Sequence, residues 1–569
     1  MSDLLGSANW STDPGHWRGE QLGKAGTPLD GHFLLLGESQ QLLGNLHVRA
    51  PRQHMISVAA TRSGKGVSLI IPNLLNYAGA VLVVDPKGEN AWVTAPYRRN
   101  VLNQHTIILD PWEEVNHAYG SLAGVEEQCA SFNPLSILDP DSDNFAEDLA
   151  YLADALILTE STKEPYFDNT ARELWAGLMA FVVENPEYSN NATLEAARKL
   201  LMQSNSELQL TIRAAIGLGP DTVAARKLAQ FENFKDTTSI MSVISSARTQ
   251  TSFLDSDALN RSMEKSDFSF DELCRGNVSI YLVLPVERLQ THARWLRLMV
   301  SIGIRAIARG RATASSHGLP ALFMLDEFGT IGKLDAVAQA FGLMAGLGMI
   351  MWGFVQDLNQ LKRDYPTHWG TFIANSQAVT CFAVLDNFTT EYISKNLGIQ
   401  TIQEPQTQTQ VSSTKAPRGQ GQGLFSSGTS HTSGTTTSMH TLSRPLMNPD
   451  EIARLPGDEC IIMGHFPPIR SRRMVYHEDW WFLHRARSDP HHPITDGVRA
   501  QALERRLRDA GSVTGLLAQE GYEVKPVRGG CYEMRGTGGA AKGVRTFATA
   551  NDLWKWAYVL VMDGVDIAI

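Results

Sequence analysis

The stretch Ala59-Ala60-Thr61-Arg62-Ser63-Gly64-Lys65-Gly66 follows the apolar run 55–59 and precedes a second apolar run, 67–75. A Gly-Lys loop between a strand and a helix is the context of a P-loop. Its backbone N–H groups, at the helix N-terminus, cradle phosphates while the lysine reaches the β- and γ-phosphates. The spacing therefore predicts a nucleotide-binding loop lined by Thr61, Arg62, Ser63, Gly64, Lys65, Gly66 and Val67.

This loop departs from the GxxxxGK[ST] pattern at two positions. Ala59 stands where the first glycine is usual, and Gly66 stands where a serine or threonine would bind Mg²⁺. Taken alone, the stretch leaves a chance Gly-Lys turn open as an alternative.

A second motif lies far downstream, where the apolar run 321–325 ends in Asp326 and Glu327. At the carboxyl end of a buried strand, Asp326 can hold Mg²⁺ through its waters and Glu327 can polarise the water that attacks the γ-phosphate. A buried strand can also end in an aspartate that merely caps the next element. Together with a P-loop in the same sheet pattern, the pair favours ATP and Mg²⁺ as ligands, with Lys65, Asp326 and Glu327 as catalytic residues.

The third motif follows the apolar run 349–354, where Gln356 precedes Asp357 and Leu358. A polar amide just past a strand end, beside the strand of Asp326, suits a γ-phosphate sensor. We therefore expect Gln356 to act in catalysis, with a helix-capping glutamine as the alternative.

Apolar runs also predict the fold. Short runs at 55–59, 80–84 and 106–109 alternate with helical patterns, which is typical of a parallel sheet covered on both faces. From 145 to 265 apolar residues recur at helical spacing instead, and the strand-like runs resume at 278–284. The pattern predicts an α/β nucleotide-binding domain with an inserted all-α domain.

Four segments follow from this pattern: 1–144 and 266–484 form the nucleotide-binding domain, 145–265 the all-α domain, and 485–569 a small α/β appendage. Within 266–484, the stretch 406–443 is nearly all Gln, Ser, Thr and Gly, so we expect a mobile loop there. The appendage contains the strand-like run 522–527 and an amphipathic stripe at 553–560. A solvated amphipathic unit and a docking module for substrate both remain open for it.

Bulk composition sets limits on partners and compartment. The net charge of −10 argues against whole-surface attraction to DNA, so any nucleic-acid contact needs a local basic lining. Five scattered cysteines without a CxxC pair fit a reducing cytoplasm. No segment has the pattern of a secretory signal or a membrane span.

Several ordered motifs resemble those of TraG/VirD-type coupling proteins of type IV secretion and conjugation. The resemblance extends over about 1–480 and includes a short element at 6–10 that follows the membrane anchor in relatives. The matching stretches are 61–67, 71–75, 84–90, 132–135, 325–328 and 356–361.

The resemblance implies a RecA-like P-loop ATPase that moves DNA, or a relaxase–DNA complex, into a type IV channel. It implies a homo-hexamer whose partners are inner-membrane components and ATPases of the secretion system. The family also carries glycine at the position of Gly66, so a water or Ser68 would complete the Mg²⁺ shell. The resemblance also implies that Asp85 lies near the nucleotide. The alternative is that Asp85 and Lys87 form salt bridges at the surface.

Two features differ from typical relatives. The transmembrane hairpin of typical relatives is missing, so the chain is either a naturally anchorless form or a soluble fragment. We expect a protein that is cytoplasmic or peripheral at the cytoplasmic face of the inner membrane. The arginine finger that some relatives place near 344–348 is absent too, with Arg294, Arg297 and Arg363 as replacements. Ala59 and Gly66 favour a rival function, a nucleotide-binding adaptor with little hydrolysis, and export of protein effectors is a further alternative.

Overall fold

The structure is a computed structural model. It describes residues 8–10, 22–23, 34–39, 46–50, 53–119, 129–159, 165–232, 238–310, 319–343, 345–415, 429–483, 485–495, 497–499, 501–502, 522–527, 531–536 and 544–547.

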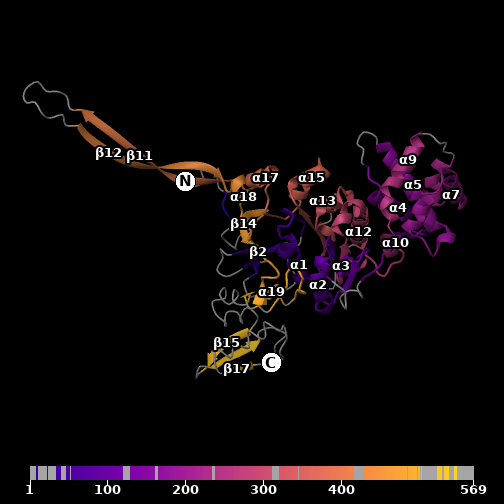
Figure 1. The fold of residues 1–569 in the computed structure, drawn as a ribbon, viewed down its shortest axis with the longest axis horizontal. Coiled ribbons are helices and arrows are strands. Elements are labelled where there is room, and N and C mark those ends of the chain that lie inside the picture. Colours follow the sequence, from indigo (N-terminus) through magenta and orange to yellow (C-terminus); the bar gives the residue numbers. More distant parts are fainter. Residues whose placement is uncertain are drawn as a thin grey trace, which may run out of the picture.

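A twelve-stranded sheet organises the main body (Figure 1). Its strand order is β1 (Leu22–Gly23), β3 (Leu46–Ala50), β2 (Leu34–Ser39), β14 (Phe466–Arg472), β13 (Glu459–Gly464), β10 (Ala378–Phe382), β4 (Met55–Ala59), β9 (Met349–Val355), β8 (Ala321–Leu325), β5 (Val81–Asp85), β7 (Val278–Val283) and β6 (His105–Leu109). Neighbouring strands are parallel from β10 to β6 and antiparallel from β10 back to β1.

Helices cover both faces of the parallel strands, because successive residues of a strand point to opposite faces. In β5, Val81 and Val83 join the core under α1 (Ile71–Asn76) and α2 (Glu89–Asn100), whereas Leu82 joins the core under α12 (Leu289–Gly310). A Cβ at Gly303 of α12 would lie 2.9 Å from Leu82, so a glycine lets this helix approach the sheet. This arrangement confirms the α/β fold predicted from the sequence.

From Phe145 to Ser262 the described residues contain helices and no strand. The helix α5 is surrounded by its neighbours and buries Trp175 and Leu178. Asp148 of α4 forms ion pairs with Arg305 and Arg309 of α12, which tie the helical region to the sheet. The helices are α4 (Phe145–Leu156), α5 (Pro165–Glu184), α6 (Leu194–Leu201), α7 (Asn205–Gly217), α8 (Val223–Leu228), α9 (Thr238–Gln250) and α10 (Asp257–Ser262).

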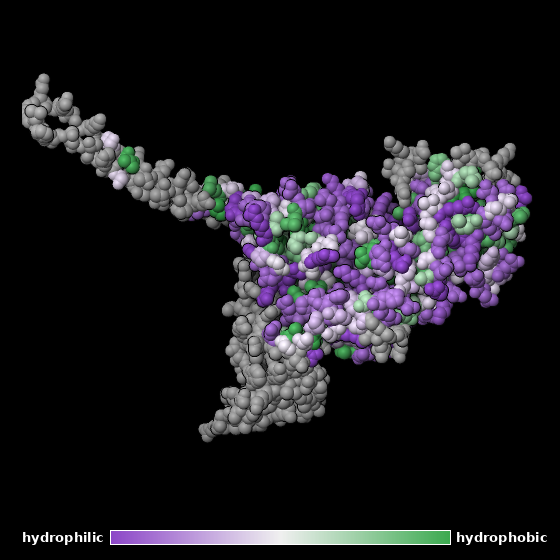
Figure 2. Space-filling model, viewed as in Figure 1, coloured by the Kyte–Doolittle hydropathy of each residue, from purple (hydrophilic) through white to green (hydrophobic). Residues whose placement is uncertain are grey.

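Shorter helices complete the body. They are α3 (Glu114–Tyr119), α11 (Glu272–Arg275), α13 (Phe328–Ile331), α14 (Asp335–Leu343), α15 (Leu358–Asp364), α16 (Trp369–Ala374), α17 (Asn387–Leu397), α18 (Pro449–Ala453) and α19 (Trp480–Leu483). Among the described residues, no helix is both long and apolar enough to cross a membrane. The side of the body seen in Figure 2 is mostly hydrophilic where it is coloured, with small scattered apolar patches.

The polar segment at 406–443 differs from the expected mobile loop. Its described residues belong to two long strands, β11 (Ile399–Lys415) and β12 (Thr429–Pro445), which pair residue by residue as an antiparallel ribbon. Threonine favours strands, and backbone pairing needs no apolar core, so a composition with few hydrophobic residues did not exclude a hairpin. Residues 416–428 lie outside the described residues.

The expected start of the appendage at 485 is also wrong. Asp489 and Ala502 are buried, and Arg487 stacks 4.3 Å above the ring of Trp92 in α2. These residues therefore belong to the main body. A separate three-stranded antiparallel sheet follows, of β15 (Tyr522–Val527), β16 (Cys531–Gly536) and β17 (Val544–Phe547), and the predicted stripe at 553–560 lies outside the described residues.

Candidate nucleotide-binding site

The three sequence motifs meet at one edge of the sheet. The P-loop follows β4, Gln356 follows β9, and Asp326 and Glu327 follow β8. These strands are parallel neighbours in the order β4-β9-β8, so their carboxyl ends lie side by side. In open α/β sheets this edge is where ligands bind.

The P-loop has the tight backbone that a phosphate-binding turn needs. Ser63 donates from its N–H and its hydroxyl to the carbonyl of Ala60, at 3.3 and 2.6 Å. Gly64 has φ +87°, and a Cβ there would lie 2.5 Å from the guanidinium of Arg473. Only glycine fits this position, and the chain then enters a π-helical turn over Gly66–Ile70.

Glu327 is held between the other two motifs. Its Oε1 lies 3.1 Å from Nζ of Lys65, and its Oε2 accepts a 2.9 Å hydrogen bond from the amide of Gln356. Glu327 itself has a left-handed backbone, with φ 55° and ψ 44°. The sequence-predicted residues Lys65, Glu327 and Gln356 are therefore in direct contact.

The helix-capping alternative for Gln356 is wrong. The cap of α15 is Asp357, whose carboxylate accepts from the N–H of Gln360 at 3.0 Å. The backbone N–H of Gln356 donates to the side chain of Gln360, also at 3.0 Å. The amide of Gln356 is thereby left to contact Glu327.

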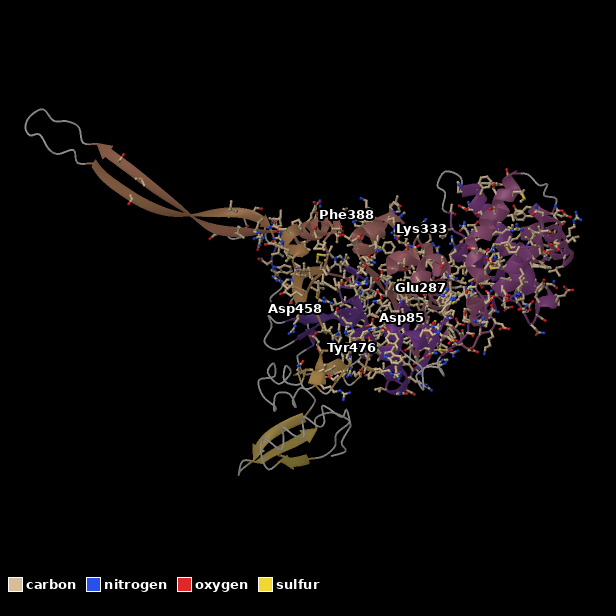
Figure 3. All side chains as sticks on the ribbon, in the orientation of Figure 1. Asp85, Glu287, Lys333, Phe388, Asp458 and Tyr476 are labelled. Carbon is tan, nitrogen blue, oxygen red and sulfur yellow. The ribbon has the colours of Figure 1, made fainter. Side chains whose placement is uncertain are left out.

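Two aspartates stand at neighbouring strand ends, Asp85 buried and Asp326 partly buried. Burial raises the pKa of Asp326 to about 6; nearby Lys65 opposes this rise and nearby Glu327 adds to it. Burial also raises the pKa of Asp85 to about 7, against the effect of its hydrogen bond from Ala91. The surface salt bridge considered for Asp85 is wrong, because Asp85 instead accepts from the N–H of Ala91 at 2.8 Å in the first turn of α2. Figure 3 labels Asp85 within the main body.

The donor set fits Mg²⁺ as a partly hydrated ion. Mg²⁺ usually keeps several waters and binds one or two carboxylates together with substrate phosphates. Asp326 is a partly buried carboxylate close to Lys65 and Glu327, in keeping with that set. The described residues contain no cluster of three or more side chains that would hold a metal by themselves.

Ser68 does not replace the missing Mg²⁺ ligand here. Its hydroxyl donates to the carbonyl of Gly64 at 2.7 Å and accepts from Arg473 at 3.0 Å, and the residue is fully buried. The position of Gly66 is open, since a Cβ there would meet nothing within 4 Å. Of the two ligands expected from the sequence, water therefore remains.

Arg473 is a site residue that the sequence analysis missed. Its guanidinium donates to the carbonyl of Gly64 at 3.1 Å and lies 4.2 Å from the ring of Phe382 at the end of β10. β10 flanks β4 on the side opposite β9. Arg473 therefore braces the P-loop from the side away from Glu327. The sequence offers only three arginines close together, Arg470, Arg472 and Arg473, without a sign of which one turns inward.

The arginines considered as replacements for the finger lie elsewhere. Arg297 is buried in α12 and donates to the carbonyl of Ala155 in α4 at 3.2 Å. Arg363 donates to the carbonyl of Gly329, just after Glu327, at 2.9 Å. Neither of these contacts is made to a P-loop residue, so the structure of one chain singles out neither arginine.

A sequence profile described as "Type IV secretory system Conjugative DNA transfer" matches residues 2–507. The chain belongs to this family. A conjugal transfer protein TraG of Escherichia coli is 26% identical over 467 residues, which are 76% of this chain and 69% of that protein. The protein VirD4 of Rhizobium rhizogenes is 25% identical over 445 residues, which are 77% of this chain and 60% of that protein.

Solved structures of the coupling protein TrwB share the fold. The trigonal form in complex with sulphate has a TM-score of 0.56 at 14% identity and covers 83% of this chain and 96% of that one. The form with ADP and Mg²⁺ has a TM-score of 0.51 at 14% identity, over 74% of this chain and 86% of that one. The RecA-like P-loop fold with an all-α domain is thus confirmed.

Proposed function

We propose that this chain is an ATP-driven coupling protein that delivers DNA, or a relaxase–DNA complex, to a type IV secretion channel. The observation that carries the proposal is the direct contact of Lys65 with Glu327 and of Glu327 with Gln356 at the carboxyl edge of the sheet. The protein would work as a homo-hexamer at the cytoplasmic face of the inner membrane. Inner-membrane components and ATPases of the secretion system would be its partners.

Each residue has a role that its position supports. The backbone N–H groups of 61–67 would cradle the phosphates, and Lys65 would neutralise the β- and γ-phosphates. Bound Mg²⁺, held by Asp326 through its waters, would supply positive charge to the same phosphates. Glu327 would take a proton from the attacking water, and Gln356 would hold the carboxylate in place.

The rival function is an adaptor that binds nucleotide without hydrolysing it efficiently. Ala59 and Gly66 favour it, because both depart from the usual loop. The placement of Glu327 favours hydrolysis, since an adaptor needs no general base beside its phosphate-binding lysine. Among relatives of the fold, TrwB has been solved with a non-hydrolysable ATP analogue and with ADP and Mg²⁺.

A turnover assay with and without single-stranded DNA separates the two functions. The parent chain should release phosphate, faster when DNA is present, and Lys65→Ala should abolish release because the loop loses its phosphate-binding charge. Lys199→Ala is the matched control, since this exposed lysine lies in α6 and pairs with Glu195 at i−4. Parent turnover no greater than that of Lys65→Ala would establish the adaptor instead.

A further inference from the structure

The longest single feature outside the main sheet is the ribbon of β11 and β12, hereafter the ribbon. Seventeen residues of each strand pair, from Ile399 opposite Pro445 to Lys415 opposite Thr429. At about 3.3 Å per residue, each strand is about 55 Å long. Figure 1 shows the ribbon projecting from the body beside α17 and α18. Among the described residues, no third strand pairs with either edge.

The base of the ribbon is fixed to the body. Gly398 has φ +85°, and its carbonyl accepts from the N–H of Leu446 at 2.9 Å. The carbonyl of Ile399 accepts from the N–H of Ala8 at 2.9 Å. Arg444 makes two hydrogen bonds to the carboxylate of Glu451 in α18, at 2.6 and 2.7 Å. The direction of the ribbon is therefore set by the body.

Most of the length of its edges lacks the usual protection against pairing. Natural edge strands are kept apart by charged residues, prolines or bulges. Residues 405–414 and 429–443 contain no Asp, Glu, Lys or Arg and a single proline, Pro405. The charged residues of the two strands, Glu404, Lys415 and Arg444, lie outside these stretches. The register runs without a shift, unlike the pairings of β13 with β14 and of β2 with β3.

A two-stranded ribbon of this kind is marginally stable in water on its own. Within the described residues it has no third strand to pair with, and Val411 and Leu442 are 66% and 45% exposed. An exposed strand edge on a fixed base is what strand addition from a second chain requires.

We propose that the ribbons of neighbouring copies pair edge to edge, so that the edge of β11 in one copy joins the edge of β12 in the next. The two edges of one ribbon belong to antiparallel strands, so identical ribbons related by rotation continue the antiparallel alternation. Such a head-to-tail contact closes into a collar when the copies form a ring. Because 405–414 and 429–443 carry no Asp, Glu, Lys or Arg, these stretches of identical copies meet without charge repulsion. The inference rests on the ring assembly in the proposed function.

The first test shortens the ribbon. Joining Ile402 to Leu442 through Asn-Gly keeps the base and replaces the rest by a two-residue hairpin turn, since these two residues are paired in the ribbon. Copies per particle are counted by mass photometry with a non-hydrolysable ATP analogue and single-stranded DNA. The shortened chain should bind the analogue as the parent does, but should form rings about tenfold more weakly.

The second test keeps the full ribbon and detects the neighbour directly. Val411→Cys and Ser433→Cys chains, each with Cys129 and Cys531 replaced by serine, are mixed and treated with a short bismaleimide. Both positions are exposed, so crosslinks between the two kinds of chain are expected when rings form. Tyr166→Cys in α5, which is 60% exposed, replaces one partner in the control and should give none.

The outcomes separate the two levels of inference. The collar is overturned, with the ring left intact, if the shortened chain forms rings in parental amounts and the full-length cysteine chains give no 411–433 crosslink. Should shortening spare the rings but abolish binding to an inner-membrane channel component, the edge belongs to that partner and the collar is wrong. If the parent chain hydrolyses ATP but never forms rings, the collar is wrong because the ring assembly is wrong. The assignment of the ATPase then still stands.

Discussion

The side-chain nitrogen of Lys65 lies 3.1 Å from Oε1 of Glu327. The cation that would meet the phosphates is thus paired with the carboxylate that would activate water. Arriving phosphates would compete for Lys65 and release Glu327. The contact therefore links occupation of the loop to availability of the base.

Glu327→Gln tests this link from both sides. Hydrolysis should fall by about 10²–10⁴-fold, because an amide cannot take the proton from water. ATP should bind at least as tightly as to the parent, since Lys65 no longer leaves a carboxylate to reach the phosphates. Single-turnover hydrolysis and analogue binding measure the two effects. Glu287→Gln is the control, as this glutamate is 71% exposed (Figure 3); parental hydrolysis in Glu327→Gln would show that another group activates the water.

Gly66→Ser should restore a direct metal ligand without disturbing the fold. A Cβ at Gly66 meets nothing within 4 Å, and a serine at this position binds Mg²⁺ in the usual loop. We expect the Mg²⁺ concentration for half-maximal turnover to fall and the melting temperature to stay the same. Gly64→Ser makes the contrast, since its Cβ would collide with Arg473. An unchanged Mg²⁺ dependence of Gly66→Ser would mean that the metal lies away from this position.

Arg473→Ala should weaken nucleotide binding more than catalysis at saturating ATP. The guanidinium braces the loop through Gly64 and Ser68, and such partly buried hydrogen bonds contribute on the order of 1 kcal/mol. The KM for ATP should rise about fivefold while kcat changes little. Arg473→Lys should recover part of the loss. Arg454→Ala, at an 81% exposed arginine, is the control. A fall in kcat alone would place Arg473 in the chemistry instead.

The sequence was most informative where strand ends carry polar residues. Parallel strands end at one edge, so Lys65, Glu327 and Gln356 could be brought together without knowing the register. Arg473 could not be found this way, because it is 409 residues from Gly64. The ribbon was missed because its strands carry no alternation of apolar and polar residues, which is the usual evidence for a strand.

Asp85 should make the protein less stable as the pH rises. Its folded pKa of about 7 lies above the ordinary 3.8, so the folded state holds the proton more tightly. The stabilisation is complete below pH 3.8 and is lost as the pH rises to about 7. The free energy of unfolding falls by up to about 1.4 kcal/mol per pH unit in that window. The pKa of Asp326 is raised as well, so Asp326 also makes the protein less stable as the pH rises. Comparing the parent with Asp85→Asn isolates the contribution of Asp85. Melting temperatures should diverge in favour of the variant between about pH 5 and 7; a constant difference would refute the assignment.

The main body should end near residue 502 and not at 484. The N–H of Arg487 donates to the carbonyl of Val93 at 3.0 Å, and the indole of Trp92 donates to the carbonyl of Ser488 at 3.1 Å. A chain ending at 484 loses these contacts and uncovers Trp92, which should cost about 2–3 kcal/mol and lower the melting temperature. A chain ending at 502 keeps them and should melt as the full chain does.

The same two chains separate stability from cargo binding. The chain ending at 502 should keep basal ATPase but recover less DNA or relaxase on co-purification, because it lacks the sheet of β15, β16 and β17. The chain ending at 484 should lose ATPase at lower temperature, since α2 also carries the N–H of Ala91 that holds Asp85. Equal melting of all three chains would show that the contacts of 485–502 add no stability to the main body. Full cargo recovery by the chain ending at 502 would remove the docking role from the appendage.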